Sequence, residues 1–331
     1  MLLRCQVPLN GWGHKLPDQT VDNAAVIARG ALPLTPEWIT RRIGVEQRHV
    51  LAPELSTSDL AIAAAQQALQ QAEVAPQDLD LIVLSTLSPD HPSPATACLV
   101  QAALGNIRCP AFDLSAACSG FLYALDTGLR HILTGARHVL VIAAETRSRF
   151  VDPRDPATAA IFGDGAGAVV ISQQPRSPAM TVQASALFAD GQGYYAVHTP
   201  AGGARLPASE STVAQRQHFI QMPHGEQIFF QVVESMTHYT TQFLKELQLD
   251  LDDIDYIIPH QANLNILQEV GRRLTLPPGK MLINLPQVGN TSSASIPIAL
   301  SQFAADMGQG KRVLLVAVGA GHTLGLTLVH T

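Results

Sequence analysis

DLDLIVL at residues 78–84 and DIDYIIP at residues 253–259 are short apolar runs of the kind that form buried strands. Their starting positions, 78 and 253, differ by 175. Two further strand-like runs begin at Arg137 and Arg312, and their positions differ by the same 175. One offset for both pairs predicts an internal duplication, in which two similar halves meet in a pseudo-symmetric core.

Helical and strand patterns alternate along most of the chain, with short breaks at Gly and Pro, which is typical of an α/β architecture. The apolar spacing predicts helices over 56–74 and 228–249, and buried strands over 79–87, 136–146, 253–260 and 311–321. We place the boundary between the halves near residues 173–180. The predicted units are residues 1–175, with the nucleophilic cysteine, and residues 176–331, with a histidine and an asparagine.

Composition excludes several classes of protein. Of the 331 residues, 47% are hydrophobic and 15% are charged, and the net charge of -6 gives no reason to expect nucleic acid or an anionic membrane as a partner. No stretch approaches the roughly 18 consecutive apolar residues of a membrane span, and early Pro and Gly residues interrupt any signal-peptide core. We expect a cytoplasmic protein. The four cysteines form no CxxC pair, so we expect neither a metal site nor a redox dithiol.

Cys118 lies in DLSAACSGF, residues 113–121, between small residues and at the point where an apolar run becomes a helix. A thiol at a helix N-terminus has its thiolate favoured by the helix dipole, so we expect a lowered pKa and a better nucleophile. A lone cysteine is more often inert and buried. The motif taken alone therefore favours the inert interpretation.

Two polar residues of the second half complete a candidate site with Cys118. His260 ends an apolar strand, the position at which α/β folds hold ligands, although it could equally be a core histidine. The offset of 175 carries Cys118 onto Ser293, within VGNTSSASIPIAL, and Asn290 lies one turn away. A turn or a helix cap would explain Asn290 equally well. The duplication predicts that these groups converge.

IFGDGAGAVVI, residues 161–171, is rich in glycine but does not complete a dinucleotide-binding GxGxxG motif. No GxxxxGK[ST] motif occurs anywhere in the chain. We predict a tight turn that leads into a strand.

Taken together, the motifs resemble the β-ketoacyl-acyl-carrier-protein synthase III family of the thiolase-like superfamily. The resemblance covers nearly the whole chain through PEWITRRIGVEQRHV (36–50), CPAFDLSAACSGFLYAL (109–125), IFGDGAGA (161–168), PHQANLNIL (259–267), VGNTSSASIP (288–297) and GAGHTLG (319–325). It implies a duplicated five-layer αβαβα thiolase-like fold, which agrees with the offset of 175, and a homodimer.

The resemblance also implies a mechanism. Cys118 would take an acyl group from a thioester, with the backbone N–H groups of Cys118 and Ala320 as the oxyanion hole. A malonyl thioester would then lose carbon dioxide while His260 and Asn290 hydrogen-bond the developing enolate oxygen. The enolate carbon would attack the acyl-cysteine and give a β-ketoacyl product. No cofactor is implied, because the coenzyme A thioester is itself the substrate.

Further residues match binding positions of the family. Trp38 and Arg42 match the positions that hold the adenine end of coenzyme A, and Asn263 matches a residue that orders the polar network of the active site. Arg272 and Arg273 match a basic pair near the docking face for acyl carrier protein. A packed aromatic residue and solvated surface charges would look the same in sequence.

The chain also departs from the family pattern. Pro156 replaces a second arginine for coenzyme A, and Asn265 replaces an arginine for carrier-protein docking. Ser93 stands where a bulky aromatic residue commonly closes the acyl pocket of the partner subunit. Ala320 replaces the middle glycine of GGG, and the segment 200–218 is longer than usual. These departures put acetyl-coenzyme A in doubt as the donor and favour medium or longer, or β-keto, acyl groups.

Three other functions compete with this one, and the residues argue against two of them. A member of the same fold that serves secondary metabolism could condense longer or β-ketoacyl thioesters, or could pass the acyl group to another nucleophile. Thiolase chemistry needs a second cysteine in the C-terminal half, and no cysteine follows Cys118. A non-catalytic subunit that only binds acyl carrier protein would be expected to lose part of the Cys, His and Asn set, and this chain keeps all three.

Overall fold

The computed structural model describes residues 2–106, 108–176 and 179–331. Its strands are β1 (Leu2–Lys15), β2 (Thr20–Asp22), β3 (Gln47–His49), β4 (Leu81–Ser85), β5 (Ala111–Leu114), β6 (His138–Thr146), β7 (Asp164–Ser172), β8 (Met180–Ala189), β9 (Tyr256–Pro259), β10 (Arg312–Gly319) and β11 (Thr323–His330). Its α-helices are α1 (Asn23–Gly30), α2 (Pro36–Arg42), α3 (Thr57–Ala72), α4 (Thr96–Ala103), α5 (Gly120–Leu133), α6 (Glu210–Ala214), α7 (Gly225–Leu247), α8 (Leu264–Arg273), α9 (Leu285–Val288) and α10 (Ser295–Met307). Short 3₁₀ turns are η1 (Pro76–Asp78), η2 (Ala117–Ser119), η3 (Arg147–Arg149), η4 (Gly191–Ala196), η5 (Leu251–Asp253) and η6 (Ser292–Ala294).

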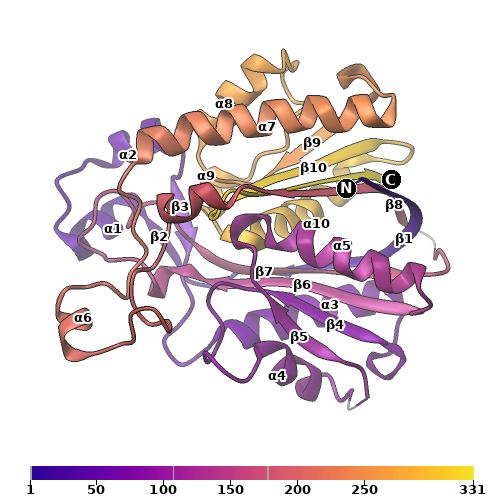
Figure 1. The fold of residues 1–331 in the computed structure, drawn as a ribbon, viewed down its shortest axis with the longest axis horizontal. Coiled ribbons are helices and arrows are strands. Elements are labelled where there is room, and N and C mark those ends of the chain that lie inside the picture. Colours follow the sequence, from indigo (N-terminus) through magenta and orange to yellow (C-terminus); the bar gives the residue numbers. More distant parts are fainter. Residues whose placement is uncertain (1, 107, 177–178) are drawn as a thin grey trace.

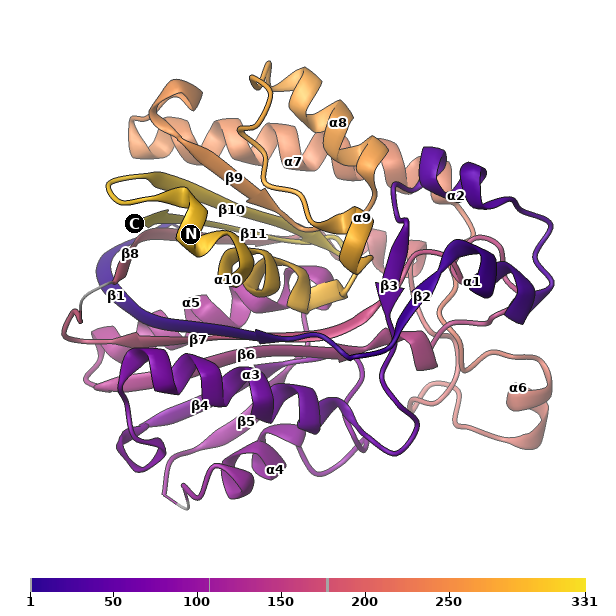
Figure 2. The ribbon, with the colours of Figure 1, turned by 180° about the vertical axis from the view of Figure 1, so that it is seen from behind.

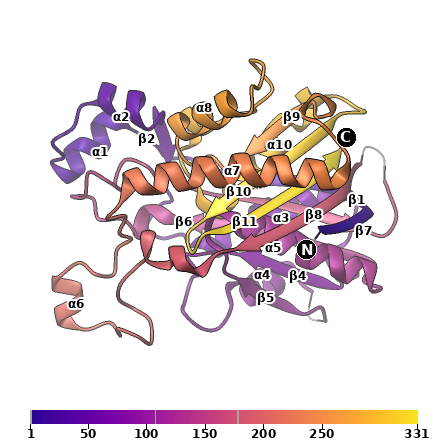
Figure 3. The same ribbon diagram turned by 45° about the horizontal axis from the view of Figure 1, so that its top comes forward.

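Five layers stack along the vertical of Figure 1, and α5 and α10 form the middle layer between the two parts of the sheet. Alternate residues of each central strand are buried on opposite faces, which is why these strands are apolar throughout. In β4, Val83 packs in the central core with α5, while Ile82 packs in the outer core with α3. In β10, Leu315 faces the central core and Leu314 faces the outer core formed with α7 and α8. Figure 3 shows α7 lying across this outer face.

The predicted duplication is visible in the sheet. The strand order is β5-β4-β6-β7-β1-β8-β11-β10-β9, so β4-β6-β7-β1 is mirrored by β9-β10-β11-β8. The pairs β4–β6 and β9–β10 are parallel, whereas β6–β7 and β10–β11 are antiparallel. The five-layer αβαβα prediction is therefore confirmed.

The offset found in the sequence also holds for the turns and the central helices. The turns η1 and η5 begin at positions 76 and 251, which differ by 175, and the same offset relates η2 to η6 and α5 to α10. Ala117 and Ser292, one in each of η2 and η6, both have a positive φ, of 48° and 52°. The two halves therefore place equivalent turns against each other at the centre of the molecule, where Cys118 and Ser293 lie.

One feature of β1 was not predicted from the sequence. Its first part, Leu2–Leu9, pairs with β8, and its second part, Leu9–Lys15, pairs with β7. Figure 2 shows this long strand running between the two parts of the sheet. The division into 1–175 and 176–331 stays a prediction. It falls between β7 and β8, and residues 177–178 of the expected boundary lie outside the described residues.

Glycines explain how closely the layers approach. A Cβ on Gly11 of β1 would lie 2.2 Å from the carbonyl oxygen of Ala68 in α3, so only glycine allows this contact. Gly167 of β7 meets Pro297 of α10 in the same way, at 2.7 Å. The glycine-rich motif at 161–171 leads into a strand, β7, as predicted. Gly167 of this strand makes room for α10 to pack against it.

Candidate active site

A cavity of about 730 Å³ opens where the two halves meet, and its lining includes Cys118, His260 and Asn290. These side chains come from η2, from the residue after β9 and from the residue two before η6. The duplicated fold brings them together because the equivalent turns η2 and η6 contact each other. The structure therefore places the three sequence-predicted residues at one cavity, and their chemical roles stay predictions.

Cys118 faces a serine of the second half. Its Sγ lies 3.7 Å from Oγ of Ser292, the second-half counterpart of Ala117. Burial raises the pKa of the Cys118 thiol to about 11, and the hydrogen bond with Ser292 lowers it only in part. The sequence argument predicted a lowered pKa from the helix start and was wrong in direction, because loss of hydration on burial is the largest cause of the shift. With a pKa of about 11 the thiol is mostly protonated at neutral pH, so a reaction at this sulfur would have to remove its proton.

The turn after β10 packs directly on the backbone of Cys118. A Cβ on Gly319 would lie 2.9 Å from the Cys118 nitrogen and 2.9 Å from the Ala116 carbonyl oxygen. Oγ1 of Thr323 donates to the same Ala116 carbonyl, at 3.0 Å, and the Ser119 hydroxyl donates to Oγ1 of Thr323, at 2.8 Å. These contacts hold the 319–323 turn rigidly against η2, as a backbone oxyanion hole requires. Ala320, the expected second donor, lines the cavity.

His260 is buried, and burial lowers its pKa to about 3, so the imidazole is neutral at physiological pH. Its Nδ1 lies 2.7 Å from Oγ of Ser295, the first residue of α10. The same Oγ accepts a longer hydrogen bond, of 3.4 Å, from the backbone N–H of Gln261. The Ser295 proton is then free to be donated to Nδ1, which places the imidazole proton on Nε2. His260 is thereby arranged as a neutral hydrogen-bond donor.

Ser295 is therefore a positioning residue. We expect Ser295→Ala to slow the condensation that the family resemblance implies by about tenfold, because the ring is no longer held in one tautomer and orientation. Loading of Cys118 should stay unchanged, and the ¹⁵N chemical shifts of His260 should report a mixture of tautomers. Ser295→Thr keeps the hydroxyl and should restore both the rate and the shifts. Wild-type condensation in Ser295→Ala would show that the hydroxyl has no part in positioning the ring.

The side-chain amide of Asn290 is oriented by its neighbours. Oδ1 accepts from the backbone N–H of Ser292 at 2.8 Å, and Nδ2 has only a long contact, of 3.5 Å, with the Ala262 carbonyl. The backbone of Asn290 is fixed too, because its N–H donates to Ile161 and its carbonyl accepts from Gly163. Anchoring Oδ1 leaves the amide NH₂ with only this long contact, and Asn290 and His260 line the same cavity, so Asn290 can offer a second donor.

The lining of the cavity also includes Trp38, Arg42 and Pro156, of which Trp38 and Arg42 are exposed. Asn263 caps the N-terminus of α8, and its Nδ2 donates to the Arg42 carbonyl at 3.1 Å. Asn265 donates to the same carbonyl at 3.0 Å. Asn263 thus ties α8 to α2. Among the described residues, Asn263 makes no hydrogen bond with His260 or Asn290. No direct contact therefore supports the expected role of Asn263 in ordering the polar network, and that role stays a prediction.

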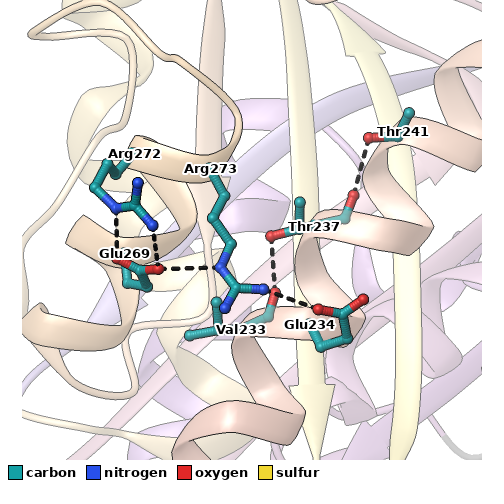
Figure 4. Close-up of polar contacts among 7 residues, drawn as sticks. All are labelled: Val233, Glu234, Thr237, Thr241, Glu269, Arg272 and Arg273. Carbon is teal, nitrogen blue, oxygen red and sulfur yellow. Dashed lines mark hydrogen bonds and ion pairs between the residues drawn. The ribbon is translucent and has the colours of Figure 1, made fainter.

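Arg272 and Arg273 are already occupied by acidic neighbours, as Figure 4 shows. Nε and Nη2 of Arg272 donate to Glu269 at 2.8 Å each. Arg273 donates to Glu269 at 3.0 Å and to Glu234 of α7 at 2.8 Å. These arginines hold the pKa of Glu269 down at about 2. A docking partner would have to compete with these exposed ion pairs, so the docking role stays a prediction.

Ser93 lies on an exposed loop and does not line this cavity. The sequence argument placed it in the pocket of a partner subunit, and that assignment stays a prediction. The long segment 200–218 carries the exposed helix α6, and an ion pair between Arg216 and Asp152 fastens it to the body. Just after this segment, Ile220 and Met222 contribute to the cavity wall.

Sequence reasoning missed three polar residues of this site: Arg147, Ser292 and Ser295. Arg147 directly follows the buried strand β6 and lines the cavity. The rule that singled out His260, a polar residue at the carboxyl end of a buried strand, could have found it. Ser292 and Ser295 carried no such signal, because VGNTSSASIP contains four hydroxyl residues of similar appearance.

A duplicated five-layer fold whose central cavity is lined by a cysteine defines a thiolase-like acyltransferase. Family models agree: residues 112–191 match 3-oxoacyl-[acyl-carrier-protein (ACP)] synthase III, and residues 244–331 match the C terminal of the same synthase. The chain is 42% identical, over 96% of both sequences, to the β-ketoacyl-[acyl-carrier-protein] synthase III of Symbiobacterium thermophilum. It belongs to the β-ketoacyl-[acyl-carrier-protein] synthase III family.

Solved structures give the same result. The 3-oxoacyl-[acyl-carrier-protein] synthase III of Aquifex aeolicus superposes with a TM-score of 0.88 at 36% identity, covering 98% of this chain and 100% of that one. The priming β-ketosynthase from the R1128 polyketide biosynthetic pathway superposes with a TM-score of 0.88 at 29% identity, covering 99% and 97%. The chain therefore resembles both 3-oxoacyl-[acyl-carrier-protein] synthases III and a ketosynthase of a polyketide pathway. Among the described residues, no helix is long and apolar enough to cross a membrane.

Proposed function

We propose that the chain loads an acyl group onto Cys118 and condenses it with a malonyl thioester. The Cys118 sulfur attacks the thioester carbonyl carbon, the bond to the coenzyme A sulfur breaks, and the thiol proton passes to that leaving thiolate. The malonyl group then loses carbon dioxide, and the electron pair of the broken C–C bond forms an enolate. The enolate carbon attacks the acyl carbonyl, releases the Cys118 thiolate and yields a β-ketoacyl thioester.

The observation that carries this proposal is the pairing of Cys118 with two neutral donors in one cavity. A carboxylate in the place of His260 or Asn290 would repel an enolate, whereas an imidazole N–H and an amide N–H stabilise it. Burial keeps His260 neutral, so it donates without first having to lose a proton. Cys118 comes from the first half and the donors come from the second, and both sides of the reaction therefore meet between the halves.

The test is a condensation assay with purified protein, an acyl-coenzyme A and malonyl-acyl carrier protein labelled at the free carboxyl carbon. We expect release of labelled carbon dioxide together with a β-ketoacyl product. An acyl adduct with no release of carbon dioxide would favour transfer of the acyl group to another nucleophile. The absence of any adduct, with every donor offered, would favour a subunit that only binds acyl carrier protein.

The expected donor is longer than acetyl. Each additional buried methylene contributes about 0.8 kcal/mol, so a few carbons would change the preference several-hundredfold in a pocket whose end, formed by Ser93 of the partner subunit, is open. Competition labelling at equal concentrations of acetyl-, hexanoyl-, octanoyl- and decanoyl-coenzyme A should therefore give mostly the longer adducts, measured by intact mass. If acetyl dominates, the pocket argument is wrong and the chain uses the short donor.

We further propose that the chain is a cytoplasmic homodimer that receives its extender on acyl carrier protein. Support for the dimer comes from β5, which ends the sheet and exposes Phe112, and from the neighbouring helix α4, which exposes Leu99. An uncovered edge strand with apolar side chains is suited to pairing with a second copy. The four cysteines are free thiols, which fits a reducing compartment.

A further inference from the structure

Arg147 is a charged residue in a place where the proposed function gives it no role. It begins η3, immediately after β6, and only 4% of it is exposed. It lines the same cavity as Cys118 and Leu87. Its guanidinium carbon lies 5.6 Å from the ring centres of both Phe150 and Phe162. The cation is thus held between aromatic rings and largely away from water.

The hydrogen bonds of Arg147 are incomplete. A guanidinium has five N–H donors, and Arg147 makes one long bond, of 3.4 Å, from Nη1 to the Leu87 carbonyl. Nε is buried and has no partner. Among the described residues, no carboxylate forms an ion pair with it. The protein alone therefore does not satisfy this group.

The nearest acid in the sequence, Glu145, is engaged elsewhere. Its Oε1 accepts from the Ser293 hydroxyl at 2.7 Å. Its Oε2 accepts from the Ser88 hydroxyl at 2.7 Å and from the Leu87 N–H at 3.1 Å. Burial raises the pKa of Glu145, whereas the charge of Arg147 and these hydrogen bonds lower it in part. Both oxygens of Glu145 are thus engaged by other donors, and among the described residues no hydrogen bond joins Glu145 to Arg147, so the guanidinium N–H groups stay available to a ligand.

A buried cation without a partner is costly, and contacts with aromatic rings offset only part of that cost. A ligand that brings an anion into contact with Arg147 would remove this cost. The planar guanidinium matches a carboxylate with two parallel hydrogen bonds, which makes arginine selective for that group. The exposed part of the cavity wall has its own cation, Arg42. Arg147 is buried in the wall of the same cavity, so it is suited to an inner part of the substrate rather than to its exposed end.

We propose that Arg147 binds a carboxylate at the far end of the acyl chain, so that the preferred donor is the coenzyme A thioester of a dicarboxylic acid. The inference rests on the proposed loading of Cys118 and names the substrate class of that step. The transfer itself is unchanged, since the distal carboxylate binds and does not react. The donor remains longer than acetyl, with a charged end in place of a purely apolar one.

The test compares donors matched in shape. Succinyl- and 4-methylpentanoyl-coenzyme A differ by a carboxylate against an isopropyl group, and so do glutaryl- and 5-methylhexanoyl-coenzyme A. With equal concentrations of each pair, intact mass should show the carboxylate adduct forming about 10- to 100-fold faster on the wild-type protein. Arg147→Leu should reverse the preference while it loads the isopropyl donors at least as fast. That loading also shows that the variant is folded.

Arg149→Leu is the matched control. Arg149 lies two residues further along η3, and its Nη2 donates to backbone carbonyls of the 52–55 loop rather than toward the cavity. The Arg149→Leu variant should keep the wild-type preference for the carboxylate donors. Arg147→Lys keeps the charge but loses the planar guanidinium, so it should retain only part of the preference for the carboxylate donor.

Three outcomes would overturn the inference. The isopropyl donor could load faster on the wild-type protein, or the ratio could be the same in Arg147→Leu. Acetoacetyl-coenzyme A could instead outcompete both succinyl and glutaryl donors, which would assign Arg147 to a neutral carbonyl. In each of these cases the proposed loading of Cys118 still stands. Absence of adducts from all donors would instead reject the loading step, and the inference with it.

Discussion

Cys118→Ala should lose the acyl adduct completely while the protein stays folded. The reason is that the sulfur is the atom that forms the new thioester bond, and no neighbouring group can replace it. Ser292 places a hydroxyl close by, with its Oγ 3.7 Å from Sγ, but an alkoxide is far harder to generate than a thiolate. Intact mass after exposure to each donor, together with thermal unfolding of the same sample, measures both parts of the expectation.

The other cysteines provide the control. Cys109 is buried, Cys98 is exposed and Cys5 is partly buried, and the lining of the cavity includes none of them. A variant with these three changed to Ala should load at the wild-type rate. A full-mass adduct on Cys118→Ala would refute the assignment of the nucleophile.

The pH dependence of Cys118 follows from its burial. Because its pKa is raised to about 11, the thiolate fraction of the free protein should grow about tenfold for each pH unit between 7 and 10. Alkylation of Cys118 by iodoacetamide, followed by peptide mass spectrometry, should show this rise with no plateau. A plateau near pH 7 would mean that the helix start outweighs burial after all.

The sequence was sufficient for the fold because the duplication is carried by local signals. Strand runs and turns recur at a constant offset, and each can be recognised from its own residues without knowing which elements pack against it. The double pairing of β1 was not predictable in this way, since side-chain alternation does not reveal which strands lie on either side. Gly11 looked like a simple break in the sequence, although its role is to let α3 approach β1.

The site shows the same division between local and distant information. Cys118, His260 and Asn290 stand out by their places at the ends of elements. The raised pKa of Cys118 could not be predicted from its motif, because the residues that bury the thiol are far away in the sequence. The ion pair between Arg273 and Glu234 likewise depends on tertiary packing. It forms because α7 packs on α8, and its two residues are 39 positions apart in the chain. Quantities that depend on tertiary packing could not be read from motifs.

His260→Ala is the second variant expected to have a large effect, and it should separate the two half-reactions. Loading should continue, because the imidazole is neutral and its Nδ1 is already bound to Ser295. Condensation should fall about 10²- to 10³-fold, the usual cost of removing one donor from a developing oxyanion. Stopped assays that follow the adduct and the β-ketoacyl product in the same sample measure both steps. His138→Ala is a matched control, because His138 also has a pKa lowered by burial and an Nδ1 2.8 Å from a serine hydroxyl, but it begins β6.

The pH profile adds an independent check on how His260 acts. Its pKa is lowered to about 3, so the neutral donor form is fully present above that value and is lost only as the pH falls through it. Condensation from a pre-loaded acyl enzyme should therefore show no loss between pH 8 and pH 5 that depends on His260. A rate that falls with a midpoint near 6.5, and a loss of loading in His260→Ala, would together mean that the imidazole acts as the base that deprotonates Cys118. The donor assignment would then be wrong, and the two half-reactions would share one catalytic histidine.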